Sequence, residues 1–251
     1  MLLRFKSTKN MIIDKVKIYN KQNNIRLRLK AVFFDMDGII FNSMPYHAQA
    51  WVYALNSVGV PFTPYDVYMN EGRTGAATVN LAFMDTFDRE ATEEEIQQIY
   101  KLKSDKFDEI NIIKAVEGIG ELLKKVKAQG LHIYVVTGSS QSSLLNSLEK
   151  YFPGIFHKDN IISAHDVKFG KPHPEPYLKA LEKSKLQPSE AIVIENAPMG
   201  VESAVAAGIF TIAINTGILE EFILDKSGAN VVYPNMAAFE RRWNELYEYV
   251  R

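Results

Sequence analysis

The sequence contains no cysteine among its 251 residues. This absence excludes thiol catalysis, disulfide bonds and cysteine-ligated zinc or iron–sulfur sites. The N-terminal stretch "MLLRFKSTKN" has too short an apolar core for a secretory signal. Together these features predict a reducing intracellular setting, the cytoplasm.

Long apolar runs and a strong net charge are missing as well. No stretch approaches the roughly 20 apolar residues that a membrane-spanning helix needs. The formal net charge of −1 gives no general attraction to nucleic acid or to membranes, so we expect neither as a partner. Hydrophobic residues make up 47% of the chain, which allows a sizeable core.

The charge is unevenly distributed along the chain. Residues 1–30 hold nine of the 29 basic residues and one of the 30 acidic residues. We interpret this segment as a basic, solvated N-terminal extension that contains one amphipathic helix near residues 12–20.

Short apolar runs alternate with helical patterns over most of the remaining chain. This alternation is typical of a parallel sheet covered on both faces, and it predicts an α/β fold with a Rossmann-like three-layer core. A single closing helix is expected over residues 235–250. The expected strands lie at residues 31–34, 132–136, 160–164, 191–194, 209–216 and 230–233.

Residues 44–112 break the alternation, since they contain helical patterns and no strand-like run. Thr92 and Glu95 have the spacing of a capping box at the start of a helix. We therefore predict a helical domain at residues 44–112, inserted into an α/β core formed by residues 31–43 and 113–251.

Polar residues follow several of the expected strands. In open α/β sheets, ligands bind outside the carboxyl ends of the strands. Oxygen ligands, hydroxyls and a cation at such an edge suit a phosphate and a hard metal ion such as magnesium. The residues concerned are Asp35, Asp37, Thr137, Gly138, Ser139, Glu195 and Asn196, with Lys171 in a loop between two strands.

Asp35 and Asp37 are the most informative pair. Residues i and i+2 of an extended chain point the same way, so both carboxylates would face one site. Their repulsion requires a cation or a shared proton. With a magnesium ion present, one carboxylate can attack phosphorus and the other can act as acid and base.

Four segments in this order resemble the signature of the haloacid dehalogenase superfamily: "DMDG", "VVTGS", the "GKP" lysine and "VIENAPMGVESAVAAG". The inserted helical domain resembles the cap of that superfamily, and "MPYHAQAW" resembles its β-phosphoglucomutase-like branch. The resemblance covers roughly residues 31–240.

The resemblance implies a role for each matching residue. Asp35 would be the nucleophile that forms an aspartyl-phosphate, and Asp37 would protonate the leaving group and then activate water or an acceptor hydroxyl. Lys171 would bridge phosphate and nucleophile. The phosphoryl oxygens would be held by Thr137, Gly138 and Ser139, and Mg²⁺ by Asp35, the Asp37 carbonyl, Glu195 and Asn196.

Two positions refine this implication. Family members that displace halide lack an acid at the position of Asp37, so Asp37 favours phosphoryl transfer over dehalogenation. Where this chain has Asn196, the family usually has an aspartate. Asn196 still offers a neutral oxygen ligand, but we expect weaker magnesium binding than with aspartate.

The predicted cap contributes residues that would select the substrate. His47 matches a histidine that helps to gate proton transfer in the mutase branch, and Gly72 matches a loop glycine. In the mutase pattern an arginine three residues later grips the distal phosphate, but this chain has Gly75 there. Arg73, beside Thr74, is a possible substitute because its guanidinium suits phosphate.

Three hypotheses follow. The missing arginine favours a magnesium-dependent phosphatase of small phosphorylated metabolites, such as sugar phosphates, and we expect a monomer because proteins with such folds often work as monomers. The first alternative is a β-phosphoglucomutase, which converts β-glucose 1-phosphate to glucose 6-phosphate. The second, from another class, is a non-catalytic binding or regulatory protein on the same scaffold.

Overall fold

A computed structural model describes residues 11–139 and 142–251 of the chain. The first ten residues of the predicted N-terminal extension lie outside this described part. Six parallel strands form one sheet in the order β3-β2-β1-β4-β5-β6. The strands are β1 (Ala31–Phe34), β2 (His132–Val136), β3 (Ile161–Ile162), β4 (Ala191–Glu195), β5 (Phe210–Ile214) and β6 (Val231–Tyr233).

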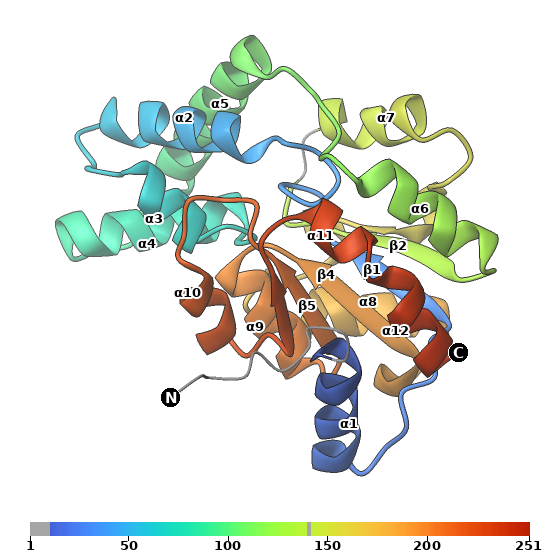
Figure 1. Cartoon of the computed structure of the whole chain (residues 1–251). Helices are drawn as coiled ribbons and strands as arrows, with labels where there is room; N and C mark the ends of the chain where they lie inside the picture. The colour runs from blue at the N-terminus through green and yellow to red at the C-terminus, as the bar shows by residue number, and fades with distance from the viewer. Residues whose placement is uncertain (1–10, 140–141) are drawn as a thin grey trace, which may run out of the picture.

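Helices cover both faces of this sheet, as the alternating apolar pattern predicted (Figure 1). The first face is covered by α1 (Met11–Asn23), α6 (Ile119–Ala128), α7 (Ser142–Tyr151), α11 (Met236–Glu240) and α12 (Trp243–Val250). The second face is covered by α8 (Glu175–Ser184), α9 (Pro198–Ala206) and α10 (Glu221–Lys226). Within the described residues, short 3₁₀ helices also lie at Lys158–Asn160, Ala164–Asp166 and Pro188–Glu190.

The N-terminal segment differs from the expected solvated extension. Helix α1 does form where the amphipathic pattern predicted a helix, but Ile12, Val16 and Tyr19 are buried in the main hydrophobic core. The Tyr19 hydroxyl also donates a hydrogen bond to the Gly208 carbonyl at 2.6 Å. The apolar face of this basic helix therefore completes one layer of the fold.

The expected single closing helix is divided into α11 and α12. The backbone N–H of Arg242 bonds to the Phe239 carbonyl at 2.8 Å, an i to i+3 bond that interrupts the helical ladder. The turn brings both Phe239 and Trp243 into the core, where they are fully buried.

Four helices lie between β1 and α6 and form a separate group at one end of the sheet (Figure 1). Capping boxes start α3, through Thr63 and Asp66, and α5, through Thr92 and Glu95. The four helices enclose their own hydrophobic cluster around Trp51. They are α2 (Met44–Asn56), α3 (Pro64–Met69), α4 (Gly75–Phe87) and α5 (Glu93–Ile110).

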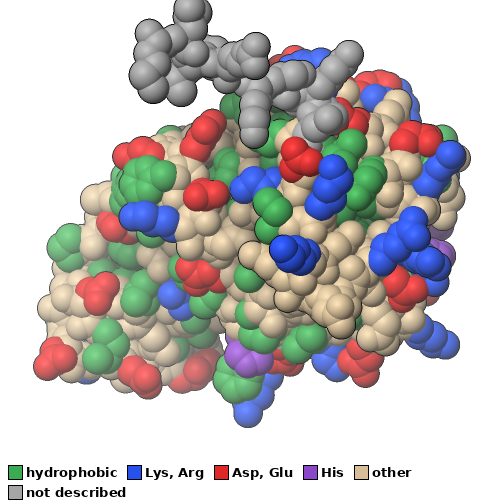
Figure 2. Space-filling model, turned by 60° about the horizontal axis from the view of Figure 1, so that its bottom comes forward, with side chains coloured by type: hydrophobic (Ala, Val, Ile, Leu, Met, Phe, Trp, Pro, Cys, Tyr) green, Lys and Arg blue, Asp and Glu red, His purple; other side chains and the backbone are tan. Residues whose placement is uncertain are grey.

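The surface carries charges of both signs. Acidic and basic side chains are interspersed across the face drawn in Figure 2. Within residues 11–139 and 142–251, we find no helix with the length and apolar character needed to cross a membrane.

Candidate active site

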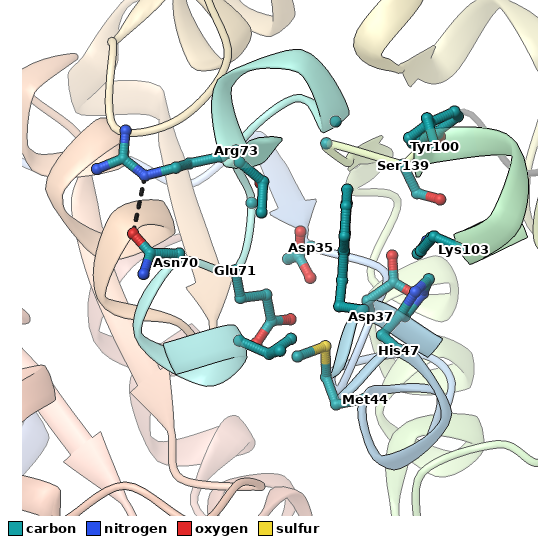
Figure 3. Close-up of a pocket in the computed structure, with 16 residues that line it drawn as sticks. Asp35, Asp37, Met44, His47, Asn70, Glu71, Arg73, Tyr100, Lys103 and Ser139 are labelled. Atoms are coloured by element: carbon teal, nitrogen blue, oxygen red, sulfur yellow. Dashed lines mark hydrogen bonds and ion pairs between the residues drawn. The ribbon is translucent and has the colours of Figure 1, made fainter. Parts of the chain in front are cut away.

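Asp35 and Asp37 follow β1 directly, at the edge of the sheet that faces the helical insert. Their residues are only 4% and 7% exposed. Both line a cavity of about 70 Å³ between the core and the inserted helices, which we call the active-site cavity (Figure 3). The spacing of the two aspartates therefore brings both carboxylates to one place.

Lys171 pairs with Asp35, one of the residues that line this cavity. Its Nζ donates to Asp35 Oδ1 at 2.6 Å, to Glu195 Oε1 at 2.6 Å and to the Val136 carbonyl at 3.0 Å. Burial alone would lower the pKa of Lys171, but the charges of Asp35 and Glu195 outweigh it and raise that pKa above its ordinary value. Lys171 therefore remains a cation beside the candidate nucleophile.

Asp37 is held by side chains from the start of the insert. Its Oδ1 accepts a hydrogen bond from Ser43 Oγ at 2.5 Å and lies 3.0 Å from His47 Nε2. Its Oδ2 lies 3.4 Å from Thr137 Oγ1. One carboxylate oxygen is thus fixed by two partners, while the other is held only weakly.

The pKa shifts of this pair assign its protons. Burial would raise the pKa of Asp37, but the charge and hydrogen bond of His47 and the hydrogen bond of Ser43 lower it overall. Burial, with the charge of Lys103, lowers the pKa of His47 despite its contact with Asp37. At neutral pH the geometry and these shifts favour a neutral His47 that donates its Nε2 hydrogen to an ionised Asp37.

The segment after β2 lies against residues 70–74, the loop between α3 and α4, which we call the cap loop. The backbone N–H of Ser139 donates to Thr137 Oγ1 at 3.0 Å, which compacts this turn, and Ser139 lines the active-site cavity. A Cβ atom on Gly138 would lie 2.5 Å from the Gly72 carbonyl oxygen. Glycine at 138 therefore permits the close approach of the cap loop to the turn.

Oxygen atoms that lack a hydrogen-bond donor mark the place where a metal ion would fit. Among the described residues, Asp35 Oδ2 and Asn196 Oδ1 are buried and have no hydrogen-bond partner. Burial, together with neighbouring carboxylates, raises the pKa of Asp35 well above its usual range despite Lys171. Two unpaired oxygens in a crowded anionic site fit a hard cation such as magnesium.

Glu195 occupies a different environment from these two atoms. Its Oε1 accepts from Lys171 and from the Tyr177 hydroxyl, and its Oε2 accepts from the backbone N–H groups of Asn196 and Ala197. Since Lys171 separates Glu195 from Asp35, the described side chains do not form a preassembled cluster of three acidic or histidine ligands.

Glu71, in the cap loop, is a site residue that the sequence reasoning missed. Asn196 Nδ2 donates to its two carboxylate oxygens at 3.2 and 3.3 Å. Burial, followed by the charges of Asp35, Glu195 and Asp37, raises the pKa of Glu71 well above its usual range. An acidic residue beside the loop glycine Gly72 was the available signal.

Glu71 also changes the interpretation of Asn196. We expected weak magnesium binding because Asn196 supplies no charge. The structure brings the carboxyl group of Glu71 from the cap to the side chain of Asn196, so an acidic side chain is available beside the position where the family usually has an aspartate.

Lys103 is the second missed residue. It comes from α5, is 3% exposed and lies 5.2 to 5.7 Å from the ring centroids of Trp51, Tyr100 and Phe107. Burial lowers its pKa to about 8, although Asp37 and Asp108 oppose this shift. Its spacing from Tyr100 and Phe107 on one helix face was the only sequence signal.

The predicted cap residues fall into two groups. His47 and Gly72 line the active-site cavity, and Gly72 has a positive φ of 91° with the Lys171 side chain against it. Arg73 also lines the cavity, but its Nε donates to Asn70 Oδ1 at 3.0 Å and its guanidinium points away from Asp35 (Figure 3). Thr74 caps α4 by accepting a hydrogen bond from the Ala77 N–H.

Comparison with known proteins agrees with this geometry. Residues 32–214 match the family described as haloacid dehalogenase-like hydrolase. A solved structure from Bacteroides vulgatus, provisionally described as a beta-phosphoglucomutase, is 43% identical to this chain. It superimposes with a TM-score of 0.94 over 97% of this chain and 100% of the other.

Two curated relatives are phosphatases by name. The phosphorylated carbohydrates phosphatase of Thermotoga maritima is 29% identical over 187 residues, which cover 72% of this chain and 82% of the relative. Pyrophosphatase PpaX of Bacillus cereus is 26% identical over 199 residues, 75% of this chain and 84% of the relative. The chain belongs to the haloacid dehalogenase-like hydrolase family, and it is a phosphohydrolase or phosphosugar mutase of that family.

Proposed function

We propose that this enzyme is a magnesium-dependent phosphatase of a small phosphorylated metabolite, with sugar phosphates as one substrate class. The observation that carries the proposal is the state of Asp35. One of its oxygens is bound to Lys171 at 2.6 Å, and the other is buried without a hydrogen-bond partner beside the active-site cavity. A carboxylate oriented in this way is suited to attack phosphorus.

The other side chains have complementary roles in the proposed reaction. Asp35 forms an aspartyl-phosphate. The protonated form of Asp37, the minor form at neutral pH, gives its proton to the leaving group, and the resulting carboxylate then takes a proton from the attacking water. Thr137, with the backbone of Gly138 and Ser139, binds phosphoryl oxygens. Lys171 holds Asp35 in place and offsets the negative charge.

The oxygen donors for magnesium come from both parts of the molecule. We propose that Asp35, the Asp37 carbonyl, Glu195 and Asn196 hold the ion, as the family resemblance implies, and that Glu71 of the cap adds a carboxylate. When bound, magnesium supplies positive charge that offsets the carboxylates and polarises the phosphoryl group.

Hydrolysis is favoured over mutase activity by the surroundings of Gly75. A Cβ atom at this position would lie 2.3 Å from Cδ2 of the Tyr100 ring, so the ring fills the space into which an arginine would extend. Arg73 is turned toward Asn70 instead. A mutase must hold a second phosphate while its intermediate reorients, and neither residue 75 nor Arg73 supplies the arginine that the mutase pattern uses for this purpose.

The small cavity adds a preference within the phosphatases. With about 70 Å³ between core and cap, a compact leaving group such as phosphate fits better than a hexose. Pyrophosphate therefore belongs beside sugar phosphates in any substrate panel, and the name of the Bacillus cereus relative supports its inclusion.

β-Phosphoglucomutase activity is the second candidate. The description of the Bacteroides vulgatus structure, at 43% identity over nearly the whole chain, favours it. It requires glucose 6-phosphate to form from β-glucose 1-phosphate in the presence of a bisphosphate primer, with little release of free phosphate.

We also propose how the enzyme is organised. Residues 44–112 would act as a cap that opens and closes over a core of residues 31–43 and 113–251. The absence of cysteine supports a cytoplasmic setting, and the small net charge supports a protein that binds neither nucleic acid nor membranes. We propose a monomer, as the family resemblance implies.

The proposed chemistry is tested by the substitution Asp35→Asn. Phosphate release from the best substrate of a panel should fall by roughly 10⁴-fold, because the amide cannot serve as the nucleophile. Asp105→Asn, on the exposed side of α5, is the matched control and should keep full activity. Full activity in Asp35→Asn would refute the proposed mechanism.

A further inference from the structure

Tyr177 is a fully buried residue of α8 that lies behind the candidate active site. Its hydroxyl donates a hydrogen bond to Glu195 Oε1 at 2.8 Å. Because a carboxylate oxygen can only accept, the hydroxyl is the donor of this bond.

The acceptor of this hydrogen bond is shared with the active-site lysine. Glu195 Oε1 also accepts from Lys171 Nζ at 2.6 Å. The second oxygen, Oε2, accepts from the backbone N–H groups of Asn196 at 2.9 Å and Ala197 at 3.3 Å. Tyr177 is thus the neutral side chain that determines where Oε1 points.

Tyr177 contacts the lysine as well. The ammonium of Lys171 lies 5.3 Å from the centroid of the Tyr177 ring. The Lys171 ammonium donates to Asp35, Glu195 and the Val136 carbonyl. The Tyr177 ring therefore lies beside a cation whose three hydrogens are already bonded. One residue therefore restrains both members of the Lys171–Glu195 pair.

We propose that Tyr177 is a positioning residue for phosphoryl transfer: its hydroxyl fixes Glu195 so that Lys171 is held at Asp35. This inference deepens the proposed function and rests on it. Without the hydroxyl, Glu195 Oε1 keeps Lys171 as its single donor and can rotate about the anchored Oε2. The ammonium then follows Glu195 away from Asp35 and from the phosphoryl oxygens.

Tyr177→Phe tests this role because it removes one oxygen atom and keeps the ring. We expect kcat to fall about tenfold, while KM changes less than twofold, since Lys171 acts on the transferring group more than on substrate binding. Tyr19→Phe is the matched control. It also removes a buried tyrosine hydrogen bond, of 2.6 Å to the Gly208 carbonyl, but in the N-terminal helix α1, and it should leave kcat unchanged.

A spectroscopic measurement separates positioning from general loss of stability. The fluoroberyllate adduct of Asp35, formed with magnesium, should show a shifted ¹⁹F resonance in Tyr177→Phe and an unshifted spectrum in Tyr19→Phe. If the Tyr177→Phe enzyme has wild-type kcat and a wild-type ¹⁹F spectrum, the inference is wrong. If the wild-type enzyme itself neither hydrolyses any substrate nor forms the adduct, the proposed function fails instead.

A double-mutant cycle checks that the effect passes through Glu195. In a Glu195→Gln background, Tyr177→Phe should cause less than a twofold further loss of kcat, since the carboxylate it positions is gone. A full additional tenfold loss would show that Tyr177 acts independently of Glu195 and would overturn the inference.

Discussion

The two sides of the active-site cavity are built differently. On the core side, Asp35 and Glu195 follow or end parallel strands, and Lys171 joins them through hydrogen bonds of 2.6 Å. On the cap side, Glu71 comes from a loop and Lys103 from a helix face. The core side therefore depends on the sheet, and the cap side depends on how four helices sit on it.

This difference suggests a division of labour. Residues fixed by strand register hold the reacting atoms, which need constant geometry. Residues carried by helices and loops determine which molecule fits, because their positions can change without disturbing the sheet. Substitutions on the core side should lower all activities together, and substitutions on the cap side should change selectivity, metal requirement or stability.

The largest effect is expected for Lys171→Met. The variant leaves Asp35 and Glu195 buried without their counter-ion, so kcat should fall by about 10³-fold for every substrate and stability should drop by about 3 to 5 kcal/mol. Steady-state kinetics and urea unfolding measure the two effects. Lys125→Met removes a half-buried salt bridge to Glu240 and is the control; equal activity losses in both variants would contradict this account.

Lys103→Met should have the opposite effect on stability. Lys103 has a pKa of about 8 in the folded chain against 10.5 for the ordinary side chain, so folding at pH 7 carries a charged, buried amine. The substitution should raise the free energy of unfolding at pH 7 by about 3 kcal/mol.

The pH dependence fixes the sign of that prediction. Below the pKa of the folded state, Lys103 is protonated in both the folded and the unfolded protein, so the full cost of burying its charge lowers the stability of the folded protein there. It disappears as the pH rises from about 8 through 10.5, because the folded state loses its proton first. Urea unfolding at pH 7 and pH 10 should show the advantage of Lys103→Met shrinking to about 1 kcal/mol or less; a constant difference would exclude the explanation.

Glu71→Gln tests whether the cap contributes to the metal site. The neutral amide should raise the magnesium concentration needed for half-saturation about tenfold, measured by calorimetric titration of the metal-free protein as well as by activity. Glu94→Gln, on the exposed surface of α5, serves as the control. An unchanged magnesium affinity in Glu71→Gln would show that Glu71 does not contribute to the metal site and that residues of the core alone bind the ion.

A change in selectivity, with little loss of total activity, is expected for Tyr100→Ala, which opens the space beside Gly75. The ratio of kcat/KM for a hexose phosphate to that for pyrophosphate should rise by about tenfold, because the larger leaving group gains room. Tyr65→Ala removes an exposed tyrosine of the cap and should leave the ratio unchanged. If Tyr100→Ala leaves the ratio as it was, the cavity does not select by size.

The core could be predicted from the sequence because local rules determine it. Buried apolar runs fix the strands, the strand ends fix the edge of the sheet, and the spacing of Asp35 and Asp37 fixes a shared direction. The packing of α1 was not predicted. Its basic composition indicated a solvent-exposed segment, but its apolar face, with Ile12 and Val16, packs into the main hydrophobic core.

The cap side escaped prediction for a different reason. Glu71 reaches Asn196, 125 residues away in the sequence, only when the cap lies against the core. Lys103 is buried because three aromatic residues surround it, which neither charge nor hydropathy of a single residue indicates. Arg73 looked like a phosphate ligand by residue type, but Asn70 holds it elsewhere.

The most direct test of the central claim is the product formed by the wild-type enzyme with magnesium. β-Glucose 1-phosphate with a bisphosphate primer, small phosphomonoesters and pyrophosphate are each scored for free phosphate and for isomerised sugar. We predict that free phosphate is the main product, with compact substrates the best, and that glucose 6-phosphate does not accumulate. Efficient conversion to glucose 6-phosphate with little free phosphate would contradict the account.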